Sequence, residues 1–129
     1  MSSKRIFIAA LSFFAAATAV RAQGNTSING LYLTQGGNSK VEVYSSGDFN
    51  QGIAVWNKKH GDVAEYRIRV LQNLQYDPST NSWAGRVYDP YNNRSYMASV
   101  ERLDNGNLKI TARSGPFSKS FIWTRVSGR

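Results

Sequence analysis

A period-two alternation of apolar and polar residues is the feature that most limits the folds open to this chain. In KVEVY, Val41 and Val43 alternate with polar neighbours, and in LKITAR, Leu108 and Ile110 do the same. Such alternation is typical of a β-strand that packs one face on a core and leaves the other to water. Beyond the first 22 residues, no stretch keeps a 3.6-residue apolar period for three helical turns. The sequence therefore predicts an all-β fold.

Turn-forming segments separate the strand-like runs, and each contains Gly, Asn, Asp or Pro. The clearest is LDNGNL, where Asn105-Gly106 predicts a hairpin with both residues at positive φ. Eight strands are expected, near residues 29–35, 40–46, 50–57, 64–72, 82–89, 94–103, 107–114 and 118–126. Short antiparallel strands joined in this way favour an eight-stranded antiparallel up-and-down barrel, because closure removes exposed strand edges.

The first 22 residues have the three-part pattern of a secretory signal peptide. Basic residues at positions 4 and 5 precede an apolar run over residues 6–20, and Val20 and Ala22 fit a cleavage site. The apolar run is shorter than the roughly 20 residues that a membrane-spanning helix needs. We therefore expect a signal peptide over residues 1–22 and a single domain over residues 23–129. The mature chain is expected to be exported to the bacterial periplasm or beyond, as a monomer without a membrane span.

The composition excludes several classes of chemistry. The chain has no cysteine, which excludes thiol catalysis, zinc–cysteine sites and disulfides. His60 is the single histidine and lies in the polar segment NKKHGDV. No paired carboxylates, nucleophile–base pair or metal-ligand spacing accompanies it. The sequence therefore predicts a protein that is not an enzyme and that holds neither a metal nor a cofactor.

The net charge of +8 raises the question of a nucleic-acid partner. Tyr66, Arg67 and Arg69 are the residues that a nucleic-acid-binding barrel would use. However, the basic residues are scattered rather than gathered in one run, and an exported protein rarely meets nucleic acid. The sequence therefore predicts no nucleic-acid partner.

The segment GRVYDPYNNRSY, residues 85–96, is interpreted as a structural turn rather than a catalytic loop. The Asp89 carboxylate can accept hydrogen bonds from backbone N–H groups further along, and Pro90 presets φ. Asn92 and Asn93 are expected to supply positive φ, so that the chain reverses. No second carboxylate or histidine lies nearby in the sequence, so a catalytic acid at this position is not favoured.

WAGRVYDPYNNRSYMASVERLDNGNLKIT, together with the closing FIWTRV, resembles the DUF2147 family of small exported bacterial proteins. The family pattern is W-x-G-G-x-I-Y-D-P-x-N-G-K-x-Y, then L-x-V and a closing W-T-R. The matching residues are Trp83, Gly85, Val87, Tyr88, Asp89, Pro90, Asn92, Tyr96, Leu108, Trp123, Thr124 and Arg125. The chain departs from the pattern at Tyr32, where Trp is usual, at Asn93, where Gly is usual, and over residues 58–75, which match poorly. The cysteines of many members are absent here, so the resemblance implies no disulfide.

This resemblance implies a lipocalin-like barrel and no particular activity. In the lipocalin arrangement, an aromatic residue on the first strand is covered by a basic side chain from the last strand. Tyr32 and Arg125 match that arrangement, because the first and last strands are neighbours in a closed barrel. The contact is expected to seal one barrel end, with a cation over an aromatic face.

Aromatic residues are numerous, with 3 Trp, 7 Tyr and 6 Phe, and they can either fill a barrel or line a small cavity. Two functions therefore stay open. The first is a non-catalytic binder of a small apolar or amphipathic ligand in the cell envelope. The second is an interaction module for an envelope protein or polymer, with a side-chain-filled barrel. Candidate ligand-binding residues are Tyr32, Trp56, Trp83, Tyr88, Tyr96 and Arg125. Among them, Tyr88 and Tyr96 are expected to face each other across a hairpin.

Overall fold

The structure, a computed structural model, describes residues 27–126, so the expected signal peptide lies outside the described residues. This part of the chain contains nine strands and one short 3-10 helix, η1. They are β1 (Gly30–Leu33), β2 (Ser39–Ser46), β3 (Phe49–Asn57), β4 (Gly61–Asp62), η1 (Ala64–Tyr66), β5 (Arg69–Asp77), β6 (Ser82–Asp89), β7 (Arg94–Arg102), β8 (Leu108–Ser114) and β9 (Phe117–Arg125). The predicted all-β fold is confirmed.

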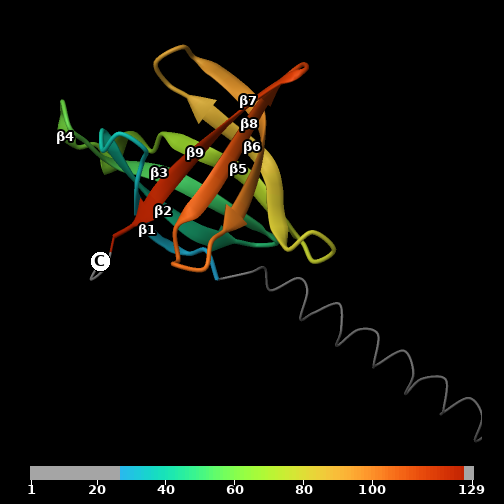
Figure 1. Ribbon diagram of the computed structural model, residues 1–129. Coiled ribbons are helices and arrows are strands. Elements are labelled where there is room, and N and C mark those ends of the chain that lie inside the picture. The colour runs from blue at the N-terminus through green and yellow to red at the C-terminus, as the bar shows by residue number, and fades with distance from the viewer. Residues whose placement is uncertain (1–26, 127–129) are drawn as a thin grey trace, which may run out of the picture.

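The sheet closes into a barrel (Figure 1). Every pairing between strands is antiparallel, and the last strand returns to the first, with Tyr32 opposite Arg125 and Leu33 opposite Thr124. β2 also pairs with β3, which joins the remaining edges. Eight strands form the wall, because the two-residue β4 only extends the end of β3. This is the predicted eight-stranded up-and-down barrel, with the edges removed by closure.

The alternation in the sequence correctly predicts which faces point inward. Val41, Val43, Val100 and Ile110 are all buried, and their polar neighbours along each strand are more exposed. Trp83 joins this core with its ring 4.8 Å from that of Tyr76, tilted by 54°. Such a tilted pair lies within the favourable range for aromatic contacts.

The fourth predicted strand is wrong in its first half. Residues 64–66 form η1, and Arg67 then adopts a left-handed conformation, with φ of 51°, that ends the helix. The carboxylate of Asp62 accepts a hydrogen bond from the backbone N–H of Ala64 at 3.0 Å, which favours a turn at this point. As a result, β5 begins only at Arg69, and Tyr66 points to solvent instead of the core.

β5 also departs from strict alternation, because it contains a β-bulge at residues 72–75. Asn73 has a φ of 52°, and the inward residues on either side, Leu71 and Leu74, are separated by three positions instead of two. Gln51 of β3 holds this bulge: its side chain donates to Asn73 Oδ1 and accepts from the Asn73 backbone N–H, both at 2.8 Å. An extra residue of this kind bends a strand and increases its twist.

The hairpin predicted at residues 105–106 is present between β7 and β8, but its turn type differs from the prediction. Only Gly106 has positive φ, at 89°. Asn105 instead accepts a hydrogen bond from the Asn107 backbone N–H at 3.0 Å, while the Leu103 N–H bonds the Asn107 carbonyl. A turn that ends in a left-handed glycine is the usual three-residue alternative to the two-residue hairpin.

Candidate functional site

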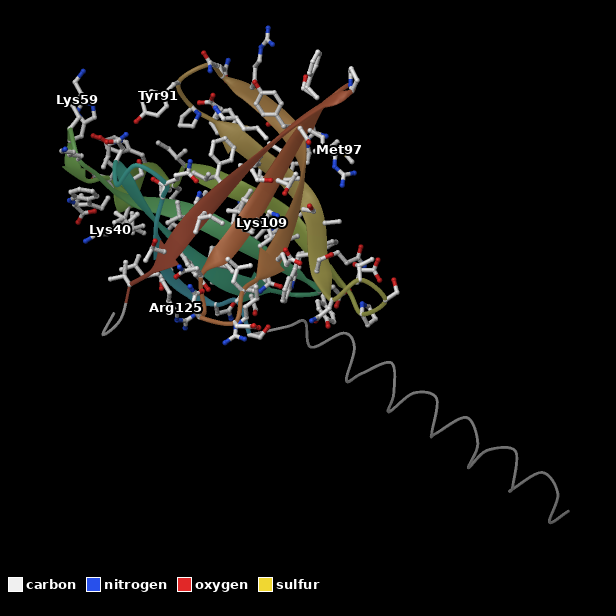
Figure 2. All side chains as sticks on the ribbon, in the orientation of Figure 1. Lys40, Lys59, Tyr91, Met97, Lys109 and Arg125 are labelled. Atoms are coloured by element: carbon white, nitrogen blue, oxygen red, sulfur yellow. The ribbon has the colours of Figure 1, made fainter. Side chains whose placement is uncertain are left out.

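The barrel is open at the end formed by the β1–β2, β3–β5, β6–β7 and β8–β9 connections, and a cavity of about 1200 Å³ enters it there. Figure 2 shows Lys59 and Tyr91 at this end and Arg125 at the opposite one. Side chains from β2, β3, β5, β6, β7, β8 and β9 line the cavity or its rim, whereas β1 contributes none. A cavity of this size is slightly larger than the usual small-molecule site of about 300–1,000 Å³.

The interior of the cavity is apolar. Val41, Ala54, Ile110 and Trp123 line it from the core, and Phe121 covers a further part of the wall. Apolar lining of this kind favours the burial of a hydrocarbon group, since removing apolar surface from water is worth about 25 cal/mol per Å².

A layer of small residues crosses the β6, β7 and β8 strands, and one of them, Ala112, lines the cavity. Across neighbouring strands, the register places Gly85 opposite Ala98, Ala98 opposite Ala112, and Ala112 opposite Lys119. Directly opposite residues in an antiparallel pair lie on the same face of a sheet. This layer therefore carries little side-chain volume on three adjacent strands, directly above the layer that contains Trp83 and Ile110.

Two basic side chains border the cavity on β8 and β9, Arg113 and Lys119. Lys119 is in register with the cavity-lining Ala112, and its Nζ lies 5.4 Å from the centre of the Phe121 ring. Sequence reasoning missed both residues. The alternation Lys119–Phe121–Trp123, continued to the end of β9, is the signal that could have placed Lys119 on the inner face.

Three of the six predicted ligand-binding residues border the cavity: Trp56, Tyr88 and Tyr96. The expected pairing of Tyr88 with Tyr96 is wrong, because the register sets Tyr96 opposite Val87 and Tyr88 opposite Ser95. Tyr88 Oη instead donates a hydrogen bond to Asn93 Oδ1 at 2.8 Å. That these three side chains bind a ligand stays a prediction.

The other three predicted residues lie outside the cavity lining. Tyr32 and Trp83 are buried in the core. The buried Trp83 Nε1 has no hydrogen-bond partner within residues 27–126. Arg125 lies at the closed end, where its guanidinium is 5.6 Å from the Tyr32 ring centre and donates to Tyr32 Oη at 2.9 Å. The aromatic–cation seal implied by the family resemblance is therefore present in the structure.

Further contacts complete the seal. Arg125 also donates to the Asn29 carbonyl at 3.0 Å, and Tyr32 Oη donates to the Ile28 carbonyl at 2.7 Å. Burial raises the pKa of the Tyr32 phenol above its usual value, and the charge of Arg125 partly offsets this effect. At Gly30, a Cβ atom would lie 2.9 Å from Arg125 Nη2, so the guanidinium occupies the space that a side chain would need.

The β6–β7 connection has the structural role that its sequence predicts. Asp89 Oδ1 accepts hydrogen bonds from the backbone N–H groups of Tyr91 at 2.9 Å and Asn92 at 3.4 Å. Asn93 has the expected positive φ, at 53°. Asn92 does not, and its side chain donates to Asp89 Oδ2 at 2.7 Å instead. Pro90 is exposed between them.

Replacing Asp89 with alanine should lower the free energy of unfolding by about 1 kcal/mol, because the turn loses its side-chain acceptor. Asp89→Asn, which keeps one acceptor oxygen, should cost less. Urea denaturation of the two variants measures both values. If Asp89→Ala retained full stability but abolished ligand binding, the carboxylate would act on the ligand and the structural interpretation would be wrong.

His60 lies exposed in the β3–β4 turn at the cavity mouth. Within residues 27–126, no three His, Cys, Asp or Glu side chains gather closely enough to hold a metal ion. In the same part of the chain, no helix has the length and apolar character needed to cross a membrane.

Comparison with known proteins agrees with this architecture. The model of the family described as "Uncharacterized protein conserved in bacteria (DUF2147)" matches residues 30–125. Among solved structures, the chain is similar to protein HP1028 from the human pathogen Helicobacter pylori, which is described as belonging to the lipocalin family. That likeness has a TM-score of 0.65 and 21% sequence identity, and it covers 78% of this chain and 84% of that one. A comparison with curated proteins found no match. The chain has a lipocalin-like fold and belongs to the DUF2147 family of bacterial proteins.

Proposed function

We propose that this protein is a non-catalytic carrier that binds a small apolar or amphipathic ligand inside its barrel, in the bacterial cell envelope. The observation that carries the proposal is the cavity of about 1200 Å³ with an apolar interior and one open end. The lipocalin-like fold supports it, because eight-stranded barrels of this kind can enclose one small ligand. The N-terminal sequence pattern supports export.

The lining indicates the chemistry of the ligand. Apolar groups occupy the interior, while Arg113 and Lys119 stand at one side of the opening. A single hydrocarbon chain that carries an anionic head group fits this distribution, with the chain inside and the head group beside the two cations. Charge-assisted hydrogen bonds to an anion are about twice as strong as neutral ones.

The alternative function, an interaction module with a filled barrel, fits the structure less well. Ala112 lines the cavity with a single methyl group, so the interior stays open at this position. A barrel that served only as a rigid surface would gain stability from a larger side chain at Ala112, which lines the cavity, because interiors pack at high density.

Titration with fatty acids and lysolipids, followed by tryptophan fluorescence, tests the proposal. Trp56 and Trp123 both border the cavity, so a bound chain changes their surroundings and their emission should shift. Replacing Ala112 with phenylalanine adds bulk inside the cavity and should cost about 1–3 kcal/mol of binding free energy, which weakens binding by at least about fivefold.

Ala84→Phe is the matched control, because Ala84 is exposed and lies outside the cavity lining. It should bind as the native protein does. Native mass spectrometry of protein purified from its own host should in addition show a retained small molecule. Absence of any fluorescence change across chain lengths, with no retained molecule, would rule out a carrier of this ligand class.

A further inference from the structure

The rim of the open end carries large aromatic side chains that contact little else. Tyr66 is 67% exposed, Tyr91 77% and Phe117 76%. Tyr66 ends η1, Tyr91 lies in the β6–β7 connection and Phe117 begins β9, yet all three border the same cavity mouth. Tyr91 lies across the rim, where its Oη accepts a hydrogen bond from Asn57 Nδ2 of β3 at 3.3 Å. Gathered exposed apolar surface of this kind marks an interaction site more often than scattered single residues do.

The same end is the basic end of the barrel. This end is formed by the connections and adjoining strand ends over residues 57–68, 89–94 and 113–119. They contain three acidic residues, and one of these, Asp89, accepts hydrogen bonds within its own turn. They contain six basic residues, Lys58, Lys59, Arg67, Arg94, Arg113 and Lys119, all of them exposed.

The closed end has the opposite balance. Its acidic residues are Asp48, Asp77, Glu101 and Asp104, and its basic ones are Arg102, Lys109 and Arg125. The barrel is therefore electrically polar along its axis, with the aromatic side chains at the positive end. Figure 2 shows Lys59 and Tyr91 at the open end.

We propose that the open end of the barrel docks on an anionic phospholipid bilayer. Tyrosine side chains favour the membrane interface, where the ring meets apolar groups and the hydroxyl stays in water. Lysine and arginine near an anionic bilayer add a favourable attraction for each charge, which falls off within a Debye length. Both requirements are met here by one surface, and that surface surrounds the mouth of the cavity.

This docking surface goes beyond ligand binding, because the aromatic and basic residues of the rim act on the bilayer whether or not the cavity is occupied. Docked in this way, the barrel places its opening against the lipid, and an acyl chain passes between bilayer and cavity without crossing water. The cost of moving hydrocarbon through water, about 0.8 kcal/mol per CH₂ group, is thereby avoided.

Co-sedimentation with vesicles tests the proposal. Mature protein without added ligand should bind vesicles of phosphatidylcholine and phosphatidylglycerol, should bind pure phosphatidylcholine much less, and should be released as salt is raised. Replacing Lys58 and Lys59 with glutamine should weaken binding by at least about tenfold, since each removed charge is worth about fivefold. The control, Arg102→Gln with Lys109→Gln, removes two exposed charges from the closed end and should leave binding unchanged.

The contribution of the aromatic side chains to vesicle binding is tested separately, with its own control variant. Phe117→Ser and Tyr91→Ser should each weaken vesicle binding, whereas Met97→Ser should not, because Met97 is exposed on the outer wall of β7 and does not border the cavity mouth. Circular dichroism confirms that each variant remains folded. No binding to phosphatidylglycerol vesicles, or equal losses in the rim variants and their controls, would overturn the proposal. Because these assays contain no soluble ligand, their failure would leave the fluorescence titration of the cavity unaffected.

Discussion

Replacing Trp123 with alanine should lower the free energy of unfolding by about 3–5 kcal/mol, because a large buried aromatic side chain is removed. Trp123 is only 5% exposed and belongs to the central apolar cluster. It lies opposite Leu108 in the β8–β9 pairing, and its ring also borders the cavity. Truncation would remove most of this contact and would enlarge the existing cavity. The neighbouring side chains would not fill the enlarged cavity, so the lost packing would not be regained.

Urea denaturation followed by far-ultraviolet circular dichroism measures this loss without depending on tryptophan emission. Trp56→Ala serves as the comparison, because Trp56 is only partly buried at the cavity mouth, and a loss of about 1–2 kcal/mol is expected there. If the two variants lost the same free energy, Trp123 would not be a core residue in solution. The order of the two effects is therefore the quantity to measure.

Replacing Gly85 with alanine should cost about 1–3 kcal/mol, although it adds a single methyl group. A Cβ atom at this position would lie 2.6 Å from the Gln72 carbonyl oxygen and 2.8 Å from that of Asn73. Both are backbone atoms of the β5 bulge, so no side-chain rotation relieves the contact. The bulge itself is held by Gln51, which is 5% exposed and makes two hydrogen bonds to Asn73.

A double-mutant cycle with Gln51→Ala separates this explanation from a general effect of adding a methyl group to the core. Gln51→Ala frees the bulge to move, so the two losses should add up to more than the loss measured in the double variant. Strict additivity, or a Gly85→Ala variant of native stability, would mean that the bulge does not press on Gly85. Urea denaturation of the four proteins provides the comparison.

The family resemblance predicted the contact between Tyr32 and Arg125 at the closed end. Tyr32 and Arg125 lie on strands far apart in the sequence, and they meet because β1 and β9 become neighbours when the sheet closes. The resemblance correctly implied this pair as a seal. The same two residues were also candidates for ligand binding, because the sequence does not show at which end of the barrel the cavity opens.

Local patterns determined much of this protein before its structure was known. Alternation in β2, β7 and β8 predicted their buried faces, and the Asp89-Pro90 turn predicted the β6–β7 connection, because both depend on residues close together along the chain. The tertiary structure alone decided the bulge at Asn73 and the position of the cavity. The left-handed Asn73 is held by Gln51 from another strand, and the layer of small residues is assembled across β6, β7 and β8. Both features depend on pairing between distant segments, which a local sequence pattern does not contain.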